Sequence, residues 1–350
     1  MNRTALALAL ALLLAHAGVR AEPVVRADDP RIARMGRTVA LADGSLRFSY
    51  PGVQLSLSFE GKALAVDALA SGERSILEVI VDGGAPRIIK LSATARTIKL
   101  VDERQAGLHR VDIMHRTESW HGVVTLARFV ADGTLRTAPV LPQRKMLVLG
   151  DSVTCGEAID RVAGEVKKPS WWNPRASYGM LAAQALGAQV QLVCHGGRGL
   201  LRSWNGRTDE DNLPDFYELA IANEEHRVRW NHAAYWPDLI VVAIGTNDFS
   251  TGIPERDAYV NAYVGLLRTL LRNHPHALVV LTEGAILNGE RKAALASYIA
   301  DTIRRVGSAR VHAVASAHYP GDATDAHPTK AQHAAMAREL LPQLRDLTGW

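Results

Sequence analysis

A short apolar run that stops at a glycine and a serine constrains this fold more than any other stretch of the chain. Residues 147–149 are Leu-Val-Leu, and Gly150, Asp151 and Ser152 follow directly. The run is typical of a buried strand, Gly150 permits a sharp turn, and Ser152 falls where a helix should begin. Ser152 is therefore a candidate nucleophile. A serine that only caps a helix would have the same neighbours, so this stretch alone leaves both interpretations open.

After residue 143 the chain alternates strands and helices. In the segment 255–273, for example, Val260, Val264, Leu267 and Leu271 recur at helical spacing. The pattern predicts strands at 145–149, 190–194, 239–244, 277–282 and 311–314, helices at 176–186, 255–273 and 329–347, and a further helix that carries Leu295, Ile299 and Ile303. Such alternation predicts a three-layer α/β domain over residues 144–350, with helices on both faces of a parallel sheet.

Residues 22–138 have a different pattern, in which short segments alternate apolar and polar side chains. Residues 54–59 and 111–115 are examples, and turn sequences such as Asp43-Gly44 separate these segments. Short strands at this spacing predict an all-β antiparallel sandwich of the jelly-roll kind. We expect a linker at residues 139–143 between the two domains, since 350 residues exceed a typical single core.

The N-terminal segment, residues 1–21, has the pattern of a signal peptide. Arg3 precedes an apolar run at residues 5–14, and small residues follow it. No later segment offers the ~20 apolar residues of a membrane helix. We therefore expect a secreted or periplasmic protein without a membrane span.

Charge and cysteine content narrow the possible partners. The net charge is +4, and the basic residues are scattered among acidic ones, so nucleic-acid binding is not expected. The two cysteines, Cys155 and Cys194, could form one disulfide in an oxidising compartment. Two buried free thiols would fit the sequence equally well.

Polar motifs with glycines follow three successive strands of the expected parallel sheet. They are residues 150–152, 195–199 and 245–248, and a fourth motif at 325–328 precedes the last helix. Ligands of such sheets bind at the carboxyl ends of the strands. We therefore expect the first three motifs side by side on one rim.

These motifs contain what acyl transfer requires. Ser152 supplies a nucleophile and His327 a base. The backbone N–H groups of Ser152 and Gly197 and the side-chain amide of Asn247 supply three donors for an oxyanion. Each residue also has a purely structural interpretation, as a cap, a turn or a surface residue. Their joint occurrence on one rim favours the catalytic interpretation.

The group that supports His327 is less obvious. Asp325 lies two residues before it, and in an extended segment that spacing leaves the imidazole poorly placed to meet the carboxylate. We hypothesise a dyad of Ser152 and His327 in which a backbone carbonyl, or otherwise Asp325, holds the Nδ1 proton.

Two long segments, 157–175 and 203–236, lack clear periodicity, and such loops are often functional or disordered. Their tryptophans, including Trp171, Trp172 and Trp204, could stack on sugar rings or pack ordinarily.

The motifs resemble those of the SGNH, or GDSL-type, hydrolases. Ser152, Gly197, Asn247 and His327 match the four blocks of that superfamily in order. Many members carry Asp three residues before the histidine, where this chain has Thr324. The third member of a triad is therefore not given by the resemblance.

The chain is also similar to carbohydrate esterase family 2 over most of its length. The matching segments are residues 107–111, 116–118, 150–156, 197–200, 213–217, 245–250 and 325–328. This resemblance implies a β-sandwich followed by an SGNH domain, and removal of O-acetyl groups from polysaccharides such as xylan or glucomannan, or from their oligosaccharides. It implies no metal or organic cofactor.

Three alternatives remain at this point. Asp151, Asp248, His195 and His327 could hold a metal ion for phosphoester hydrolysis. An inactive second domain would make the protein a carbohydrate-binding protein. Within the esterases, a lipase or thioesterase is the nearest alternative, and acyl-chain preference separates it from an acetylesterase.

Overall fold

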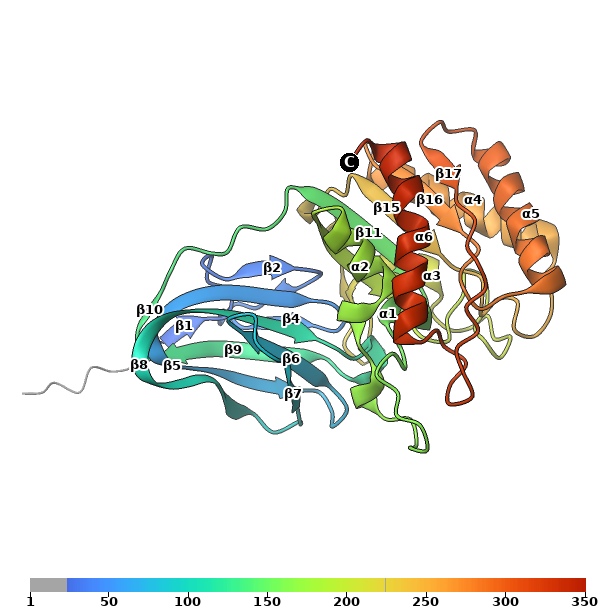
Figure 1. The fold of residues 1–350 in the computed structure, drawn as a ribbon. Coiled ribbons are helices and arrows are strands. Elements are labelled where there is room, and N and C mark those ends of the chain that lie inside the picture. Colours follow the sequence, from blue (N-terminus) through green and yellow to red (C-terminus); the bar gives the residue numbers. More distant parts are fainter. Residues whose placement is uncertain (1–23, 224) are drawn as a thin grey trace, which may run out of the picture.

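The computed structural model describes residues 24–223 and 225–350, which form a β-sandwich domain and an α/β domain (Figure 1). The predicted signal peptide, residues 1–21, lies outside the described residues. The strands of the first domain are β1 (Val24–Arg26), β2 (Ala33–Met35), β3 (Val39–Ala40), β4 (Leu46–Phe48), β5 (Gln54–Ala70), β6 (Ile76–Val81), β7 (Arg87–Lys90), β8 (Arg96–His115), β9 (Val124–Ala131) and β10 (Thr134–Leu135).

Two long strands, β5 and β8, connect both layers of this domain. The first half of β5 pairs with the second half of β8 and with β2 and β10, and its second half pairs with the first half of β8 and with β9. The register shifts near Gly61, as it does at bulges that bend a strand. Phe59 and Val66, from the two halves, share one buried core with Phe129 of β9. The predicted all-β domain is confirmed, and one continuous antiparallel sheet builds it.

The second domain contains a parallel sheet of five strands in the order β12-β11-β15-β16-β17. This confirms the predicted α/β architecture, with element ends within a few residues of those expected. Its strands are β11 (Arg144–Gly150), β12 (Ala188–Cys194), β15 (Leu239–Ala243), β16 (Leu278–Thr282) and β17 (Val311–Ala313). Its helices are α1 (Ser152–Cys155), α2 (Tyr178–Ala185), α3 (Leu213–Tyr217), α4 (Arg256–Asn273), α5 (Gly289–Val306) and α6 (Lys330–Thr348), and a small hairpin pairs β13 (Leu219–Ile221) with β14 (Val228–Arg229).

The interior strand β11, which pairs with β12 and β15, is buried on both faces, as its continuous apolar sequence requires. Met146 and Val148 lie in the core formed with α2 and α6. Leu147 and Leu149 lie in the core formed with α4 and α5, and this core is continuous with that of the sandwich. The sheet is thus covered on both sides (Figure 1).

The two domains are joined by buried polar contacts. The Arg37 guanidinium, fully buried in the sandwich, donates hydrogen bonds at 2.6 Å to the carbonyl oxygens of Tyr217 and Leu219. The hydroxyl of Tyr50 donates to the carbonyl of Phe216, also at 2.6 Å. Burial lowers the pKa of Arg37 to about 10. The sandwich therefore docks on the segment that contains α3 and β13.

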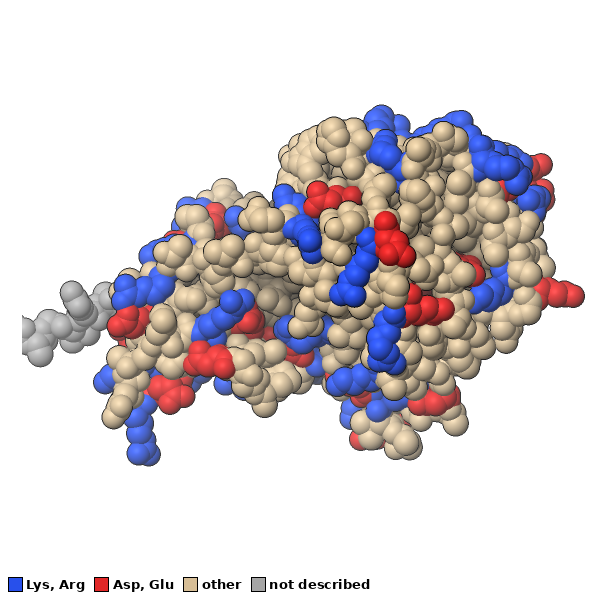
Figure 2. Space-filling view, turned by 45° about the horizontal axis from the view of Figure 1, so that its top comes forward, with Lys and Arg blue, Asp and Glu red and all other residues tan. Residues whose placement is uncertain are grey.

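The predicted linker, residues 139–143, lies between the end of β10 at Leu135 and the start of β11 at Arg144. Among the described residues, no helix combines the length and the apolar character needed to cross a bilayer. On the face shown in Figure 2, lysines and arginines are interspersed with aspartates and glutamates.

Candidate active site

Ser152 stands at the first position of α1, directly beyond the end of β11. The Asp151 carboxylate accepts a hydrogen bond from the Val153 N–H at 3.0 Å and so caps the helix. Gly150 is required by space, because a Cβ there would lie 2.8 Å from the carbonyl oxygen of Ala243 and closer still to the Thr154 hydroxyl. The tight turn therefore holds Ser152 at the rim of the sheet, as the strand–glycine–serine pattern indicates.

His327 contacts both Ser152 and Asp325. Its Nε2 lies 2.9 Å from the Ser152 Oγ, and its Nδ1 lies 2.6 Å from the Asp325 Oδ1. Asp325 Oδ1 also accepts the backbone N–H of His327 at 2.9 Å. The segment is thus a turn and not an extended strand. The expectation that a spacing of two residues keeps this carboxylate from the imidazole is wrong, and the carboxylate, not a backbone carbonyl, contacts Nδ1.

The protonation equilibria of this pair favour a charged imidazole beside a carboxylate. Burial lowers the pKa of His327, but the hydrogen bond to Asp325 and the negative charge of Glu157 outweigh it, so the pKa lies above its usual value. Burial raises the pKa of Asp325, but His327 and Lys167 bring it well below its usual range. In its neutral form, an imidazole with a raised pKa is a stronger base than a free histidine, so His327 is well suited to take a proton from Ser152.

The insertion 157–175 adds two charged groups to this cluster. Lys167 Nζ lies 2.9 Å from Asp325 Oδ2 and also pairs with the carboxylate of Glu157. Glu157 Oε2 lies 3.6 Å from His327 Nε2, on the side of the ring that faces Ser152. Burial lowers the pKa of Lys167, but the charge of Glu157 and the hydrogen bonds with Glu157 and Asp325 outweigh it and raise that pKa.

Arg161, from the same insertion, holds the backbone of the histidine loop. Its guanidinium donates hydrogen bonds at 2.5 Å to the carbonyl oxygens of Asp325 and His327, and at 2.9 Å to that of Pro328. The prediction that long irregular loops are functional pointed to this insertion, but no spacing singled out Glu157, Arg161 or Lys167.

The predicted oxyanion loop follows β12. Gly197 has a φ of 75°, which favours glycine, and its carbonyl accepts the Trp204 N–H at 2.8 Å. The buried Asp248 carboxylate accepts backbone N–H groups from Leu200, Leu201 and Arg202 at 2.8, 2.7 and 3.1 Å. Burial raises the pKa of Asp248 to about 6, against these hydrogen bonds. Asp248 thus fixes the loop that carries Gly197, a role that the sequence did not reveal.

Strand register brings the three expected oxyanion donors to one rim. Gly150 pairs with Cys194 of β12 and with Ala243 of β15, so the residues that follow each strand are neighbours. The Asn247 amide donates one hydrogen to the Arg198 carbonyl at 2.8 Å, which leaves its second hydrogen for a ligand. Within residues 24–223 and 225–350, the N–H groups of Ser152 and Gly197 donate to no protein acceptor.

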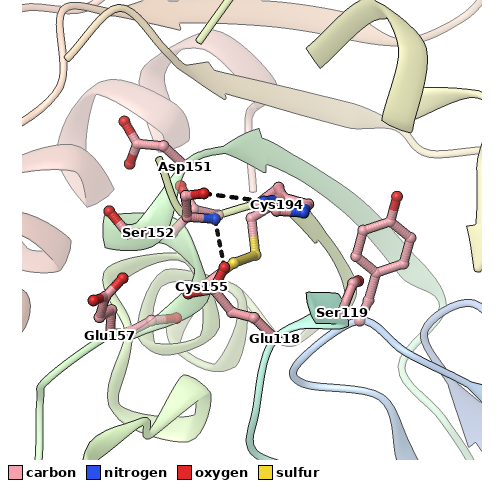
Figure 3. Close-up of a disulfide and its surroundings, with 12 residues drawn as sticks. Glu118, Ser119, Asp151, Ser152, Cys155, Glu157 and Cys194 are labelled. Atoms are coloured by element: carbon pink, nitrogen blue, oxygen red, sulfur yellow. Dashed lines mark hydrogen bonds between the residues drawn. A yellow bond between two sulfur atoms is a disulfide. The ribbon is translucent and has the colours of Figure 1, made fainter. Parts of the chain in front are cut away.

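Cys155 and Cys194 form a disulfide beside Ser152 (Figure 3). It links the end of α1 to the end of β12, three residues before Gly197. The sequence allowed either a disulfide or two buried free thiols. The structure contains the disulfide, so the second alternative is wrong. The bond ties the predicted nucleophile to the predicted oxyanion loop.

The three tryptophans differ in exposure. Trp171 and Trp172 are each 2% exposed, so they pack in the interior and do not stack on a ligand. Trp204 is 62% exposed and lies against Gly197, where a Cβ would be 2.9 Å from the indole. An exposed aromatic face is thus adjacent to the oxyanion loop.

The metal hypothesis has no ligand set in the part of the chain that the structure describes. No three His, Cys, Asp or Glu side chains gather there as metal ligands would. Asp248 is already occupied by three N–H donors. His195 is buried, its Nδ1 contacts the Gly196 carbonyl at 3.0 Å, and burial lowers its pKa to about 4.

Comparisons with known proteins agree for both domains. Residues 34–139 match the family described as "Carbohydrate esterase 2 N-terminal", and residues 148–335 match the "GDSL-like Lipase/Acylhydrolase family". The chain is 58% identical over 327 residues to an "Acetylxylan esterase / glucomannan deacetylase" of Cellvibrio japonicus (strain Ueda107), covering 93% of this chain and 91% of the relative.

Solved structures of similar proteins have the same fold. A family two carbohydrate esterase from Cellvibrio japonicus superposes with a TM-score of 0.93 at 57% identity, covering 94% of this chain and 98% of the other. A family two carbohydrate esterase from Clostridium thermocellum in complex with cellohexaose has a TM-score of 0.84 at 28% identity, covering 91% and 99%. This chain belongs to the family two carbohydrate esterases.

Proposed function

We propose that this protein removes O-acetyl groups from acetylated polysaccharides or oligosaccharides of the xylan and glucomannan type. The observation that carries the proposal is the contact of Ser152 Oγ with His327 Nε2 at 2.9 Å, backed by Asp325 at 2.6 Å on Nδ1. A nucleophile, a base and a group that orients the base are the elements of acyl transfer by serine. Membership of the carbohydrate esterases supports the substrate class.

The reaction proceeds in two halves. Ser152 Oγ attacks the acetyl carbonyl carbon while His327 Nε2 takes the serine proton, and the sugar oxygen leaves with that proton. Water then attacks the acetyl-serine while His327 Nε2 takes its proton, and His327 returns that proton to Ser152 Oγ as the bond to the acetyl group breaks and acetate leaves. The N–H groups of Ser152 and Gly197 and the free amide hydrogen of Asn247 stabilise the negative oxygen in each half.

The exposed Trp204 supports a sugar substrate. Its indole lies against Gly197, so a pyranose ring could stack on it while its acetyl group reaches Ser152. Deletion of the indole should raise KM for acetylated oligosaccharides more than for a small aryl acetate that lacks a sugar.

We also propose that the protein is exported to the periplasm or the medium. The signal-peptide pattern of residues 1–21 supports this location. The Cys155–Cys194 disulfide is a second support, because disulfides persist in oxidising compartments. N-terminal sequencing of the exported protein would test it: a mature chain that still begins at Met1 contradicts it.

The decisive test measures acetate release from acetylated xylan, acetylated glucomannan and a nitrophenyl acetate side by side. We expect turnover by the wild type and a loss of at least about 10,000-fold in the Ser152→Ala variant. The Asp322→Asn variant, which changes a carboxylate of the histidine loop that does not touch the imidazole, is the matched control.

Two results would replace this function by an alternative. Faster cleavage of long-chain than of acetyl esters would indicate a lipase or thioesterase. Glycan binding without acetate release, unchanged in Ser152→Ala, would indicate a carbohydrate-binding protein. The family two carbohydrate esterase from Clostridium thermocellum was solved in complex with cellohexaose, so glycan binding is measured alongside turnover.

A further inference from the structure

Glu118 is a residue of the sandwich that is buried among loops of the hydrolase domain (Figure 3). It lies three residues beyond the end of β8 and has no exposed surface. Its Oε1 accepts the Trp172 Nε1–H at 2.7 Å. Its Oε2 accepts the backbone N–H of Gly196 and, at 3.3 Å, the Nε1–H of Trp120. One carboxylate thus joins the sandwich, the insertion 157–175 and the oxyanion loop.

Burial of the Glu118 carboxylate does not in itself stabilise the folded protein. Burial, together with the charge of Glu157, raises the pKa of Glu118 to about 7, although the N–H donors of Trp172 and Gly196 and the charge of His327 act in the opposite direction. Within the described residues, no Lys or Arg forms an ion pair with it. Arg116, two residues earlier, pairs with Glu78 and Asp160 instead. A buried carboxylate without an ion pair costs free energy, and the direct contacts of Glu118 are with the N–H groups that it orients.

The groups that Glu118 orients, Gly196 and Trp172, belong to the two segments that carry the oxyanion N–H and the charged neighbours of His327. Gly196 precedes Gly197, and its N–H is anchored on Glu118, so the peptide that enters the oxyanion loop has a fixed direction. A Cβ at Gly196 would lie 2.9 Å from both carboxylate oxygens, which shows how closely the backbone approaches. Trp172, on the other oxygen, belongs to the insertion that carries Glu157 and Lys167.

We propose that Glu118 is a positioning residue of the esterase reaction, through which the sandwich sets the oxyanion N–H of Gly197. The proposal rests on the serine esterase function proposed above. An oxyanion forms only in the transition state, so the loss of this support acts on kcat and leaves KM nearly unchanged.

The test is the Glu118→Gln variant, which keeps the size of the side chain. Trp172 and Gly196 donate to different oxygens of the carboxylate, and in the amide an NH₂ group replaces one of these oxygens, so one of the two donors loses its acceptor. We expect kcat for nitrophenyl acetate to fall by about 10- to 100-fold, with KM within about two-fold of the wild type. The rate at which a serine-directed organophosphate modifies Ser152 should fall in parallel, because its adduct uses the same donors.

Glu78→Gln is the matched control. Glu78 is 2% exposed at the same domain interface and pairs with Arg116 at 3.0 Å and with Arg175, but it has no contact with the oxyanion loop. We expect a lower melting temperature and nearly unchanged kcat per titrated active site. Equal losses of kcat in Glu118→Gln and Glu78→Gln would contradict the proposal, as would a Glu118→Gln variant with wild-type kcat.

A second variant probes the same contact if Glu118→Gln does not fold. Gly196→Ala adds a Cβ against the carboxylate at a residue whose φ is not positive, and we expect the same fall in kcat at constant KM. Unchanged kcat in Gly196→Ala would overturn the proposal. A wild type that reacts with the organophosphate but releases no acetate would instead contradict the proposed function. Equal organophosphate rates in wild type and variants would contradict only the role of Glu118.

Discussion

Carboxylates from two loops approach the His327 ring at its two nitrogens, and their contacts differ in kind. One loop is the segment that contains His327 itself, and the other is the insertion 157–175. The loop of residues 322–328 reaches Nδ1 through Asp325 at 2.6 Å, whereas the insertion 157–175 brings Glu157 only to 3.6 Å from Nε2. The first distance is that of a strong hydrogen bond, and the second is that of a charge interaction across a small gap. The first loop sets the orientation of the ring, and the second adjusts its charge.

This difference follows from what each ring nitrogen must do. Nδ1 keeps its proton throughout the reaction, so a fixed carboxylate there selects the tautomer with a free Nε2. Nε2 has to exchange a proton with Ser152 and then with the leaving sugar oxygen. A carboxylate held slightly away from Nε2 stabilises the imidazolium without competing for that proton.

The largest effect should come from Asp325→Ala. We expect kcat for nitrophenyl acetate to fall by about 100- to 10,000-fold, because the imidazole loses both its orientation and its tautomer. Asp322→Asn, on the same loop, should keep most of its activity. If Asp325→Ala stays within about 10-fold of the wild type, the backbone alone holds His327 and the dyad hypothesis survives.

A smaller loss should follow from Arg161→Gln. Arg161 binds three carbonyl oxygens of the histidine loop, so its removal lets the ring drift from Ser152. We expect kcat to fall by about 10- to 100-fold. The pH profile should keep its acid limb, since Arg161 acts on position and not on charge. A shifted acid limb at unchanged kcat would show that Arg161 acts through its charge and not by positioning the histidine loop.

The smallest effect should come from Glu157→Gln and should be seen in the pH profile. His327 acts as a base only when neutral, so kcat/KM falls as pH drops through its raised pKa. Removing the charge of Glu157 lowers that pKa and moves the acid limb to lower pH, while the plateau changes by no more than about three-fold. Glu165→Gln, on the same insertion, should leave the limb in place. A limb that moves to higher pH would contradict the role given to Glu157.

The rim residues could be predicted because they depend on local rules. An apolar strand that ends at a glycine places the next polar residues at the carboxyl edge of the sheet, and parallel register aligns Ser152 with the loops that carry Gly197 and Asn247. The expectation that Asp325 is poorly placed to meet the imidazole failed because it assumed an extended segment. In the structure, the carboxylate accepts the His327 N–H and folds back in a turn.

Other residues of the site could not be predicted, since their partners are distant in sequence. Glu118 and Gly196 are 78 residues apart, and Arg161 and His327 are 166 apart. Both contacts come from irregular backbone, where side chains follow no period that a sequence could reveal. Their positions are set by how the sandwich and the insertion pack on the sheet.

The buried Arg37 has a consequence for protein engineering. Its guanidinium is satisfied by carbonyl oxygens of the segment after the oxyanion loop, so separating the two domains would leave polar groups on both sides without partners and expose a shared apolar core. The α/β domain is therefore unsuited to expression or transfer without the sandwich domain. Chimeras that exchange specificity between related enzymes should transfer both halves together, or redesign the surface between them.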